Sequence, residues 1–229
     1  MQRRVSIAVM VMFLATLAAC AVDPVTSTHS SQPSAAPATT SAPPSAEATV
    51  ASGATIQILA ETLIVTPSEG PASTYSYFDD PSQLVIELEE LFGTEPEKTV
   101  DEAETHFRRS DNLEWDGFFI RIFDGSSPPD SEYFNVYTLA ASVSDVQIVA
   151  AGNVQVGDAE ADVASIADTE NLDTGGTERI QFFTLDETPV ESNADGYPGE
   201  GATASVSVWI TRPSTTVTRI GAPAFNFGA

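Results

Sequence analysis

The chain has 229 residues and is strongly acidic, with 33 Asp and Glu against 9 Lys and Arg and a formal net charge of −24. This balance argues against nucleic-acid binding, because proteins displace counterions from phosphates with basic side chains. It also argues against a folded surface that lies flat on anionic lipids. With one cysteine and two histidines, the chain cannot form an internal disulfide and is poorly supplied with ligands for zinc.

The N-terminal segment predicts export from the cytoplasm. Arg3 and Arg4 precede an apolar run over residues 5–19, which is shorter than the roughly 20 residues of a membrane-spanning helix and has the length of a signal-peptide core. An ordinary cleaved signal peptide and an uncleaved anchor are both compatible with such a run.

The run ends in Leu-Ala-Ala-Cys at residues 17–20, which resembles the lipobox of bacterial lipoproteins. The resemblance implies that a signal peptide over residues 1–19 is removed and that Cys20 receives a diacylglycerol. Two acyl chains satisfy the requirement that stable anchoring takes more than one. We therefore expect an extracytoplasmic protein that is held on the cell membrane through Cys20.

Residues 20–54 are predicted to be the lipidated cysteine followed by a linker. Beyond Cys20 this stretch consists mainly of Ala, Ser, Thr and Pro, contains no aromatic residue, and carries only two charged ones, Asp23 and Glu47. Such a composition cannot bury enough apolar surface to offset the entropy lost on ordering. We expect a disordered leash that holds a folded region, residues 55–229, away from the membrane.

Two helices are predicted in the first half of the folded region. The stronger one covers residues 81–92, because Asp80 can cap it, a proline suits its first turn and Gly93 ends it. A shorter helix over residues 100–107 is predicted from a Thr-x-x-Glu capping box. The apolar stripe of the first helix consists of Leu84, Val85, Leu88, Leu91 and Phe92.

Period-two alternation predicts strands through most of the remaining chain, interrupted by one further helix over residues 159–168. In the segment 202–211, alanine, valine and isoleucine occupy every second position, so Trp209 is expected on the solvent side of its strand. The predicted strands cover residues 56–65, 113–123, 133–140, 146–150, 154–156, 179–185, 202–211 and 217–220.

This order predicts an α+β fold, with antiparallel sheets and helices packed on one face. Residues 146–157 align without gaps to residues 217–228, with apolar residues or glycine at matching positions. Hydrophobic spacing alone can produce such a match. If it is a duplication, the folded region consists of two tandem repeats of strand, helix and three strands, namely modules 55–145 and 146–229.

With the helix at 81–92, this architecture resembles the tandem modules of β-lactamase inhibitory proteins and of BamE-type lipoproteins. The resemblance implies a concave sheet surface that binds another protein. The chain lacks the paired cysteines of the inhibitors, and no binding residue is carried over.

No catalytic constellation is predicted. A Ser-His-Asp triad needs a histidine base, and the folded region holds only His106, without a Gly-x-Ser-x-Gly turn. Glu114 and Asp116 flank Trp115 and would share one face of a strand, as in a glycosidase pair, but so acidic a chain produces such pairs by chance. We expect a protein that is not an enzyme.

One segment suggests a metal ion. Glu191, Asn193 and Asp195 alternate and are followed by Gly196, an arrangement similar to the first half of a calcium loop. The twelfth position holds Ala202 instead of glutamate. A polar hairpin loop turned by Asp-Gly is the alternative. Calcium is therefore the only cofactor that the sequence suggests.

The leading hypothesis for function is a membrane-anchored, surface-exposed lipoprotein that binds another protein of the envelope. Aromatic residues dominate binding hot spots, so Trp209, and after it Trp115, are the predicted contact residues. The alternative is a lipoprotein that binds a solute or calcium. An enzyme acting on wall polymers is the third possibility.

Overall fold

The computed structural model describes residues 53–103, 108–124, 132–173, 179–190 and 202–226. All of them belong to one compact unit, Thr49–Ala229. The predicted signal peptide, Cys20 and almost all of the predicted linker lie outside the described residues.

The described chain is mainly β. Strands account for 51% of it and helices for 13%. The prediction of an α+β fold with helices packed on one face is therefore wrong. Only two α-helices occur in these ranges, α1 (Ser82–Phe92) and α2 (Glu160–Ala164), and neither is long and apolar enough to cross a membrane.

The smaller sheet has five strands in the order β3-β2-β1-β9-β8. Its strands pair antiparallel except for β1 and β9, which are parallel and far apart in the chain. They are β1 (Thr55–Ile58), β2 (Thr62–Thr66), β3 (Ser73–Ser76), β8 (Ser142–Val143) and β9 (Val146–Ala150).

The larger sheet has eight strands in the order β10-β11-β12-β13-β7-β6-β5-β4, all antiparallel. The pairing of β13 with β7 joins a C-terminal meander to an earlier one. The strands are β4 (Glu97–Asp101), β5 (Ser110–Trp115), β6 (Phe118–Phe123), β7 (Phe134–Thr138), β10 (Thr169–Asp173), β11 (Ile180–Pro189), β12 (Thr203–Thr211) and β13 (Arg219–Asn226).

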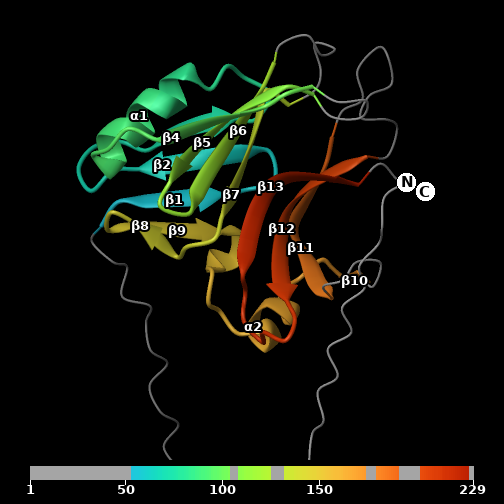
Figure 1. Cartoon of the computed structure of the whole chain (residues 1–229). Helices are drawn as coiled ribbons and strands as arrows, with labels where there is room; N and C mark the ends of the chain where they lie inside the picture. The colour runs from blue at the N-terminus through green and yellow to red at the C-terminus, as the bar shows by residue number, and fades with distance from the viewer. Residues whose placement is uncertain (1–52, 104–107, 125–131, 174–178, 191–201, 227–229) are drawn as a thin grey trace, which may run out of the picture. The chain divides into compact units, whose positions relative to one another are not determined.

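One hydrophobic core is shared by both sheets and by α1 (Figure 1). The smaller sheet contributes Ile56, Leu63 and Ile148, which are fully buried. From α1, Phe92 packs against Phe118 of the larger sheet with ring centroids 5.8 Å apart. The inner faces of both sheets are covered in this way, which leaves the outer face of the larger sheet available for function.

The helix predicted over residues 81–92 is confirmed as α1. The backbone N–H of Ser82 donates to the Asp80 carboxylate at 2.8 Å, and Gly93 ends the helix in the left-handed region at φ 72°. The helix predicted over residues 100–107 is wrong in its first part, because residues 97–101 form β4 and pair with β5. Residues 104–107 lie outside the described ranges.

Two segments that were each predicted as a single strand form hairpins of two strands in the structure. Residues 113–123 form a hairpin, in which Asp116 and Gly117 make a two-residue turn with φ angles of 42° and 93°. Residues 56–65 likewise contain β1, a turn, and β2. The segment 154–156, predicted as a strand, follows the short 3₁₀ helix η1 (Ala151–Asn153) and is not in a sheet.

The tandem repeat of strand, helix and three strands is also wrong. Strands from both sides of residue 145 are hydrogen-bonded into both sheets. The two aligned segments have different structures, because residues 146–157 begin with β9 of the smaller sheet, whereas residues 217–228 contain β13 of the larger one. Their similarity is one of hydrophobic spacing.

Candidate binding face on the larger sheet

The outer face of the larger sheet follows from the alternation along β12. Ala204, Val206 and Val208 point into the core and are fully buried. Ser207 and Trp209, which alternate with these residues along the strand, are half-buried on the opposite side. Trp209 therefore lies where the alternation predicts, and its role in binding a partner stays a prediction.

Strand register places a run of flat side chains across this face. Phe182 of β11 is opposite Trp209 of β12, which in turn is opposite Arg219 of β13. The Arg219 guanidinium carbon lies 4.1 Å from the centroid of Trp209 and 4.3 Å from that of Tyr137. Tyr137 then stacks on Phe119, with centroids 4.3 Å apart and an interplanar angle of 8°. The guanidinium is thus held between two aromatic rings.

Two hollows flank Trp209, and together we call them the outer groove. They share Ser207, Trp209 and Ala224. The larger hollow, about 480 Å³, lies over β10 to β13 and is lined by Phe182, Asn171, Thr184, Glu187 and Phe225, among others. The smaller hollow, about 350 Å³, lies over β6, β7, β13 and β12 and is lined by Arg121, Asn135, Tyr137, Arg219 and Gly221, among others.

The floor of the groove depends on small residues. A Cβ on Gly221 would lie 3.2 Å from the Val136 carbonyl oxygen and 3.3 Å from the Cβ of Tyr137. Next to it the Ser207 hydroxyl donates to the Gly221 carbonyl at 3.1 Å, and the Ser205 hydroxyl donates to the Ala224 carbonyl at 3.2 Å. These bonds lie where the register between β12 and β13 shifts. The floor of the groove is therefore held by side-chain hydrogen bonds as well as by the backbone hydrogen bonds between the strands.

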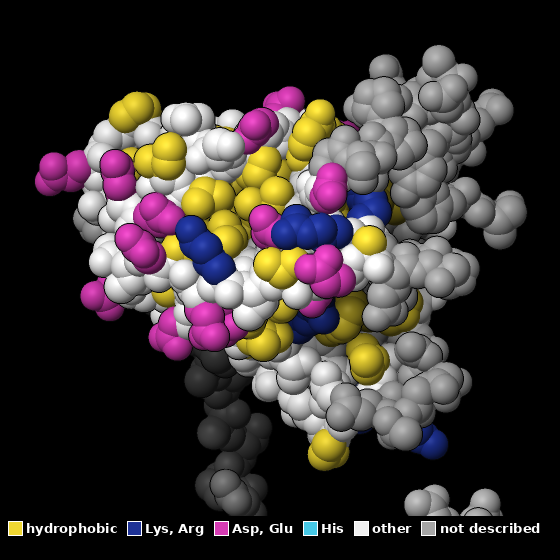
Figure 2. All heavy atoms as spheres, turned by 45° about the horizontal axis from the view of Figure 1, so that its top comes forward, with side chains coloured by type: hydrophobic (Ala, Val, Ile, Leu, Met, Phe, Trp, Pro, Cys, Tyr) yellow, Lys and Arg dark blue, Asp and Glu magenta, His cyan; other side chains and the backbone are white. Residues whose placement is uncertain are grey.

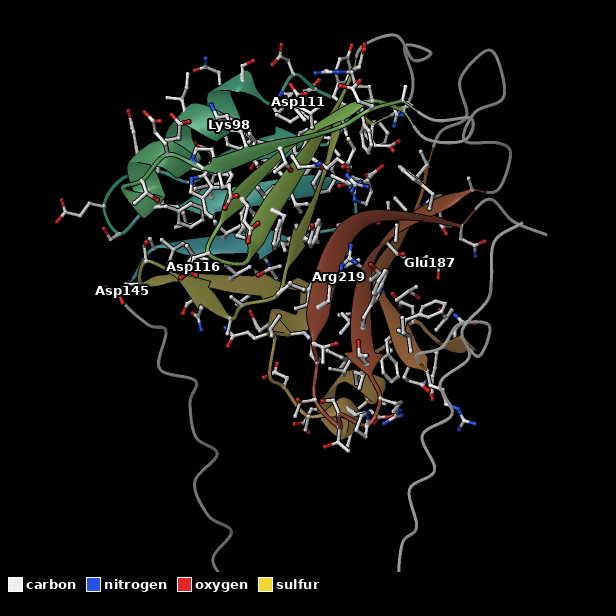
Figure 3. The ribbon with its side chains drawn as sticks, viewed as in Figure 1. Lys98, Asp111, Asp116, Asp145, Glu187 and Arg219 are labelled. Carbon is white, nitrogen blue, oxygen red and sulfur yellow. The ribbon has the colours of Figure 1, made fainter. Side chains whose placement is uncertain are left out.

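Arg219 is the central charge of the groove (Figure 3). Burial lowers the pKa of its guanidinium and nearby Arg121 lowers it further, whereas Tyr137 raises it. An arginine nevertheless stays protonated at neutral pH. Within the described part of the chain, no carboxylate lies within 4.0 Å of Arg219.

Arg121 differs from Arg219 in having an acidic partner. Its Nη2 lies 3.1 Å from an oxygen of Asp101, and its Nε donates to the Asn112 side chain at 3.0 Å. Among the described residues that line the smaller hollow, Arg219 is therefore the cation without a carboxylate partner. Figure 2 shows acidic side chains at many positions of one face, with several Lys and Arg side chains near its middle.

Trp115 is not a surface residue, which corrects the prediction that it contacts a partner. It is 3% exposed, and its ring packs on Phe92 with centroids 5.7 Å apart. Its indole N–H donates to the Thr94 carbonyl at 3.1 Å. Trp115 lies two positions after Leu113 on β5, so the two side chains point to the same inner face of the strand. This spacing is visible in the sequence.

The carboxylates considered for glycosidase chemistry do not share a strand face. Glu114 lies on β5, whereas Asp116 occupies the turn that follows it. His106 and the predicted calcium ligands Glu191, Asn193 and Asp195 lie outside the described residues. Across the ranges that the structure describes, no three His, Cys, Asp or Glu side chains are grouped to hold a metal ion.

A separate hollow of about 690 Å³ lies between the start of α1 and strands β4 to β6. It is mostly apolar, with Val85, Leu113 and Ile122 in its lining and Tyr133 41% exposed. Lys98 and Asp111, labelled in Figure 3, also line it. Its lining residue Phe123 has the Arg108 guanidinium carbon 4.0 Å from its ring centroid, but Arg108 differs from Arg219 in being paired with Glu132 at 2.8 Å.

Several groove residues were not found from the sequence. Arg219, Phe182 and Phe119 each lie in or beside a predicted strand, but nothing local shows that they meet Trp209 or Tyr137. Their proximity depends on the register of strands that are distant in the chain. Comparison with protein-family models, with curated proteins and with solved structures returned no match for this chain.

Proposed function

We propose that this protein is a lipid-anchored, non-enzymatic module of the bacterial cell envelope that binds another envelope protein through the outer groove. The lipobox-like motif at residues 17–20 and the Ala/Ser/Thr/Pro-rich stretch behind it support the anchor and the leash. The observation that carries the binding role is the stack of Trp209, Arg219 and Tyr137 on an open sheet face.

The stack has the properties of a binding hot spot. Tryptophan, tyrosine and arginine are the residue types that contribute most to protein interfaces. Here they project from hydrogen-bonded strands and touch one another, so little side-chain entropy remains to be lost when a partner binds. A hollow lies on each side of Trp209, and these hollows can accept side chains of a partner.

A small solute is the second candidate ligand. The larger hollow, of about 480 Å³, falls within the range of roughly 300–1,000 Å³ that small-molecule sites occupy. Its lining mixes aromatic faces with hydroxyl, amide and carboxylate groups, which suits a polar organic molecule. Calcium binding at residues 191–195 stays a prediction.

The proposal is tested by crosslinking on intact host cells that express the tagged full-length protein, followed by mass spectrometry of the recovered partners. Wild type is expected to yield one reproducible envelope protein, and Trp209→Ala is expected to lose most of it. The variant should melt closer to wild type than a core substitution does, because Trp209 is only half-buried. It loses a cation–π contact worth about 0.5–1 kcal/mol and part of its apolar contact with the sheet.

Tyr133→Ala is the matched control, since Tyr133 is an exposed aromatic residue in the separate hollow beside α1. Loss of the partner in this variant but not in Trp209→Ala would move the binding site to that hollow. Metabolic labelling of the same cells with a tagged fatty acid tests the anchor, because wild type is expected to carry the label and Cys20→Ser is not. A wild-type protein without the label would contradict the lipid anchor.

A further inference from the structure

The smaller hollow of the outer groove brings two arginines together from different strands. Arg121 comes from β6 and Arg219 from β13, on either side of β7. Asn135 of β7, directly opposite Arg121 in the register, adds an amide group, and Ser207 adds a hydroxyl. All four polar groups line one cavity of about 350 Å³.

Over the described residues, the side chains that line this hollow and their ion-pair partners carry a net charge of one unit positive. Asp101 offsets Arg121 at 3.1 Å, whereas none of the described carboxylates pairs with Arg219. A half-buried cation without a counter-charge is unfavourable. A negatively charged ligand therefore gains binding energy by supplying that counter-charge. In a chain of formal charge −24, such a site favours a group with one negative charge over a polyanion.

The shape of the site favours a planar anion. The guanidinium carbon of Arg219 lies 4.1 Å from the ring centroid of Trp209 and 4.3 Å from that of Tyr137. A guanidinium that stacks on rings through its faces keeps its planar edge of N–H groups for hydrogen bonds. This edge is the part of arginine that binds a carboxylate through two parallel hydrogen bonds. Trp209 lines both hollows, so an apolar group next to the carboxylate would reach the larger hollow near Phe182.

We propose that the outer groove recognises a protein segment by its carboxylate, which binds Arg219 in the smaller hollow while an adjacent apolar side chain lies in the larger one. The segment is the C-terminus of the partner, whose α-carboxylate binds Arg219 and whose last side chain is apolar. This inference rests on the proposed function of the groove and adds the chemistry of its partner.

The test is a titration of the ¹⁵N-labelled full-length protein in detergent micelles, read from the indole N–H signals of its two tryptophans. The probes are N-acetyl-phenylalanine, which has a ring beside a carboxylate, and N-acetyl-phenylalanine amide, which differs only in lacking the charge. The acid is expected to shift the Trp209 signal saturably, and the amide is expected to bind at least about tenfold more weakly, as for loss of a charged hydrogen bond. The Trp115 signal should stay in place and report an intact core.

Two variants assign the effect to Arg219. Arg219→Gln is expected to weaken binding of the acid by at least about tenfold, so that acid and amide become equal. Arg219→Lys keeps the charge but not the planar edge, and it is expected to fall between wild type and Arg219→Gln. An unshifted Trp115 signal in both variants shows that they are folded.

Four results would overturn the inference: equal affinity for acid and amide in the wild type, no saturable shift with either probe within its solubility, tighter binding of phenyl phosphate, or tighter binding of glucuronate. The last two would assign the groove to phosphorylated ligands or to acidic sugars. If cells still lose their crosslinked partner in Trp209→Ala while the probes show no preference for the carboxylate, this inference fails and the proposed function stands. If the probes behave as expected and the partner is kept, the proposed function fails instead.

Discussion

At the scale of residues, the two tryptophans of this protein have opposite surroundings. Trp115 is 3% exposed and contacts Phe92 and Phe118 in the core. Trp209 is half-buried on the outer face, where one side of its ring is covered by Arg219. The same residue type thus stabilises the fold at one position and offers a contact surface at the other.

Replacement of Trp115 by alanine is expected to cost about 3–5 kcal/mol of unfolding free energy, because it leaves a cavity in a packed core. The Thr94 carbonyl also loses its indole donor. Chemical denaturation of both tryptophan-to-alanine variants measures the difference, with Trp209→Ala as the matched control. Similar losses in the two variants would contradict the assignment of Trp209 to a contact surface.

At the scale of elements, sequence patterns predicted correctly those elements that are stabilised by contacts between residues close together in the chain. Helix α1 was predicted because its apolar stripe lies within the element and Pro81 and Gly93 directly flank it. Residues 100 and 101 were predicted as the start of a helix but belong to β4, because hydrogen bonds to β5 outweigh a short capping pattern. The hairpin turn at Asp116 and Gly117 was missed although Asp-Gly is a strong turn signal, since the aromatic residues on both sides read as one strand.

Helix α2 has only five residues and is held by a tertiary contact. Both oxygens of the Glu160 carboxylate accept hydrogen bonds from Arg212 at 2.7 Å, and the side chains are 27% and 32% exposed. These bonds lower the pKa of Glu160 below its ordinary value of 4.5. A carboxyl with a lowered folded pKa contributes stability above its unfolded pKa, and this contribution is lost as the pH falls through the folded value.

Glu160→Gln is therefore expected to lower the melting temperature slightly at pH 7, and the difference from wild type should shrink as the pH falls below the ordinary value of 4.5. Melting curves between neutral pH and about pH 3 check the trend. Glu90→Gln is the control, because it removes the same charge from an exposed position on α1. A difference that grows on acidification would show that the pair with Arg212 does not stabilise the fold.

At the scale of the whole molecule, the candidate site depends on features that no single segment carries. Alternation along residues 202–211 placed Trp209 on the outer side. The partners of Trp209 are set by the pairing of β12 with β13 and of β13 with β7. Arg219 and Tyr137 are 82 positions apart in the chain, so only the sheet order shows that they stack.

The same topology makes the folded region one cooperative unit. In the smaller sheet, β1 pairs with β9, as in Ile56 with Ile148. In the larger sheet, β7 pairs with β13, as in Tyr137 with Gly221. A cut between residues 145 and 146 therefore separates strands within both sheets and exposes core side chains on each piece, so neither piece retains a complete hydrophobic core.

The fragments 55–145 and 146–229 are accordingly expected to be unfolded or aggregated when expressed alone, whereas residues 53–229 should melt in a single transition. Circular dichroism melting curves and the dispersion of amide signals in NMR spectra measure both states. Mixing the two fragments should restore part of the native spectrum if the paired strands can find each other. A cooperative transition with well-dispersed signals from either fragment alone would show that this half carries its own core, in conflict with the shared sheets.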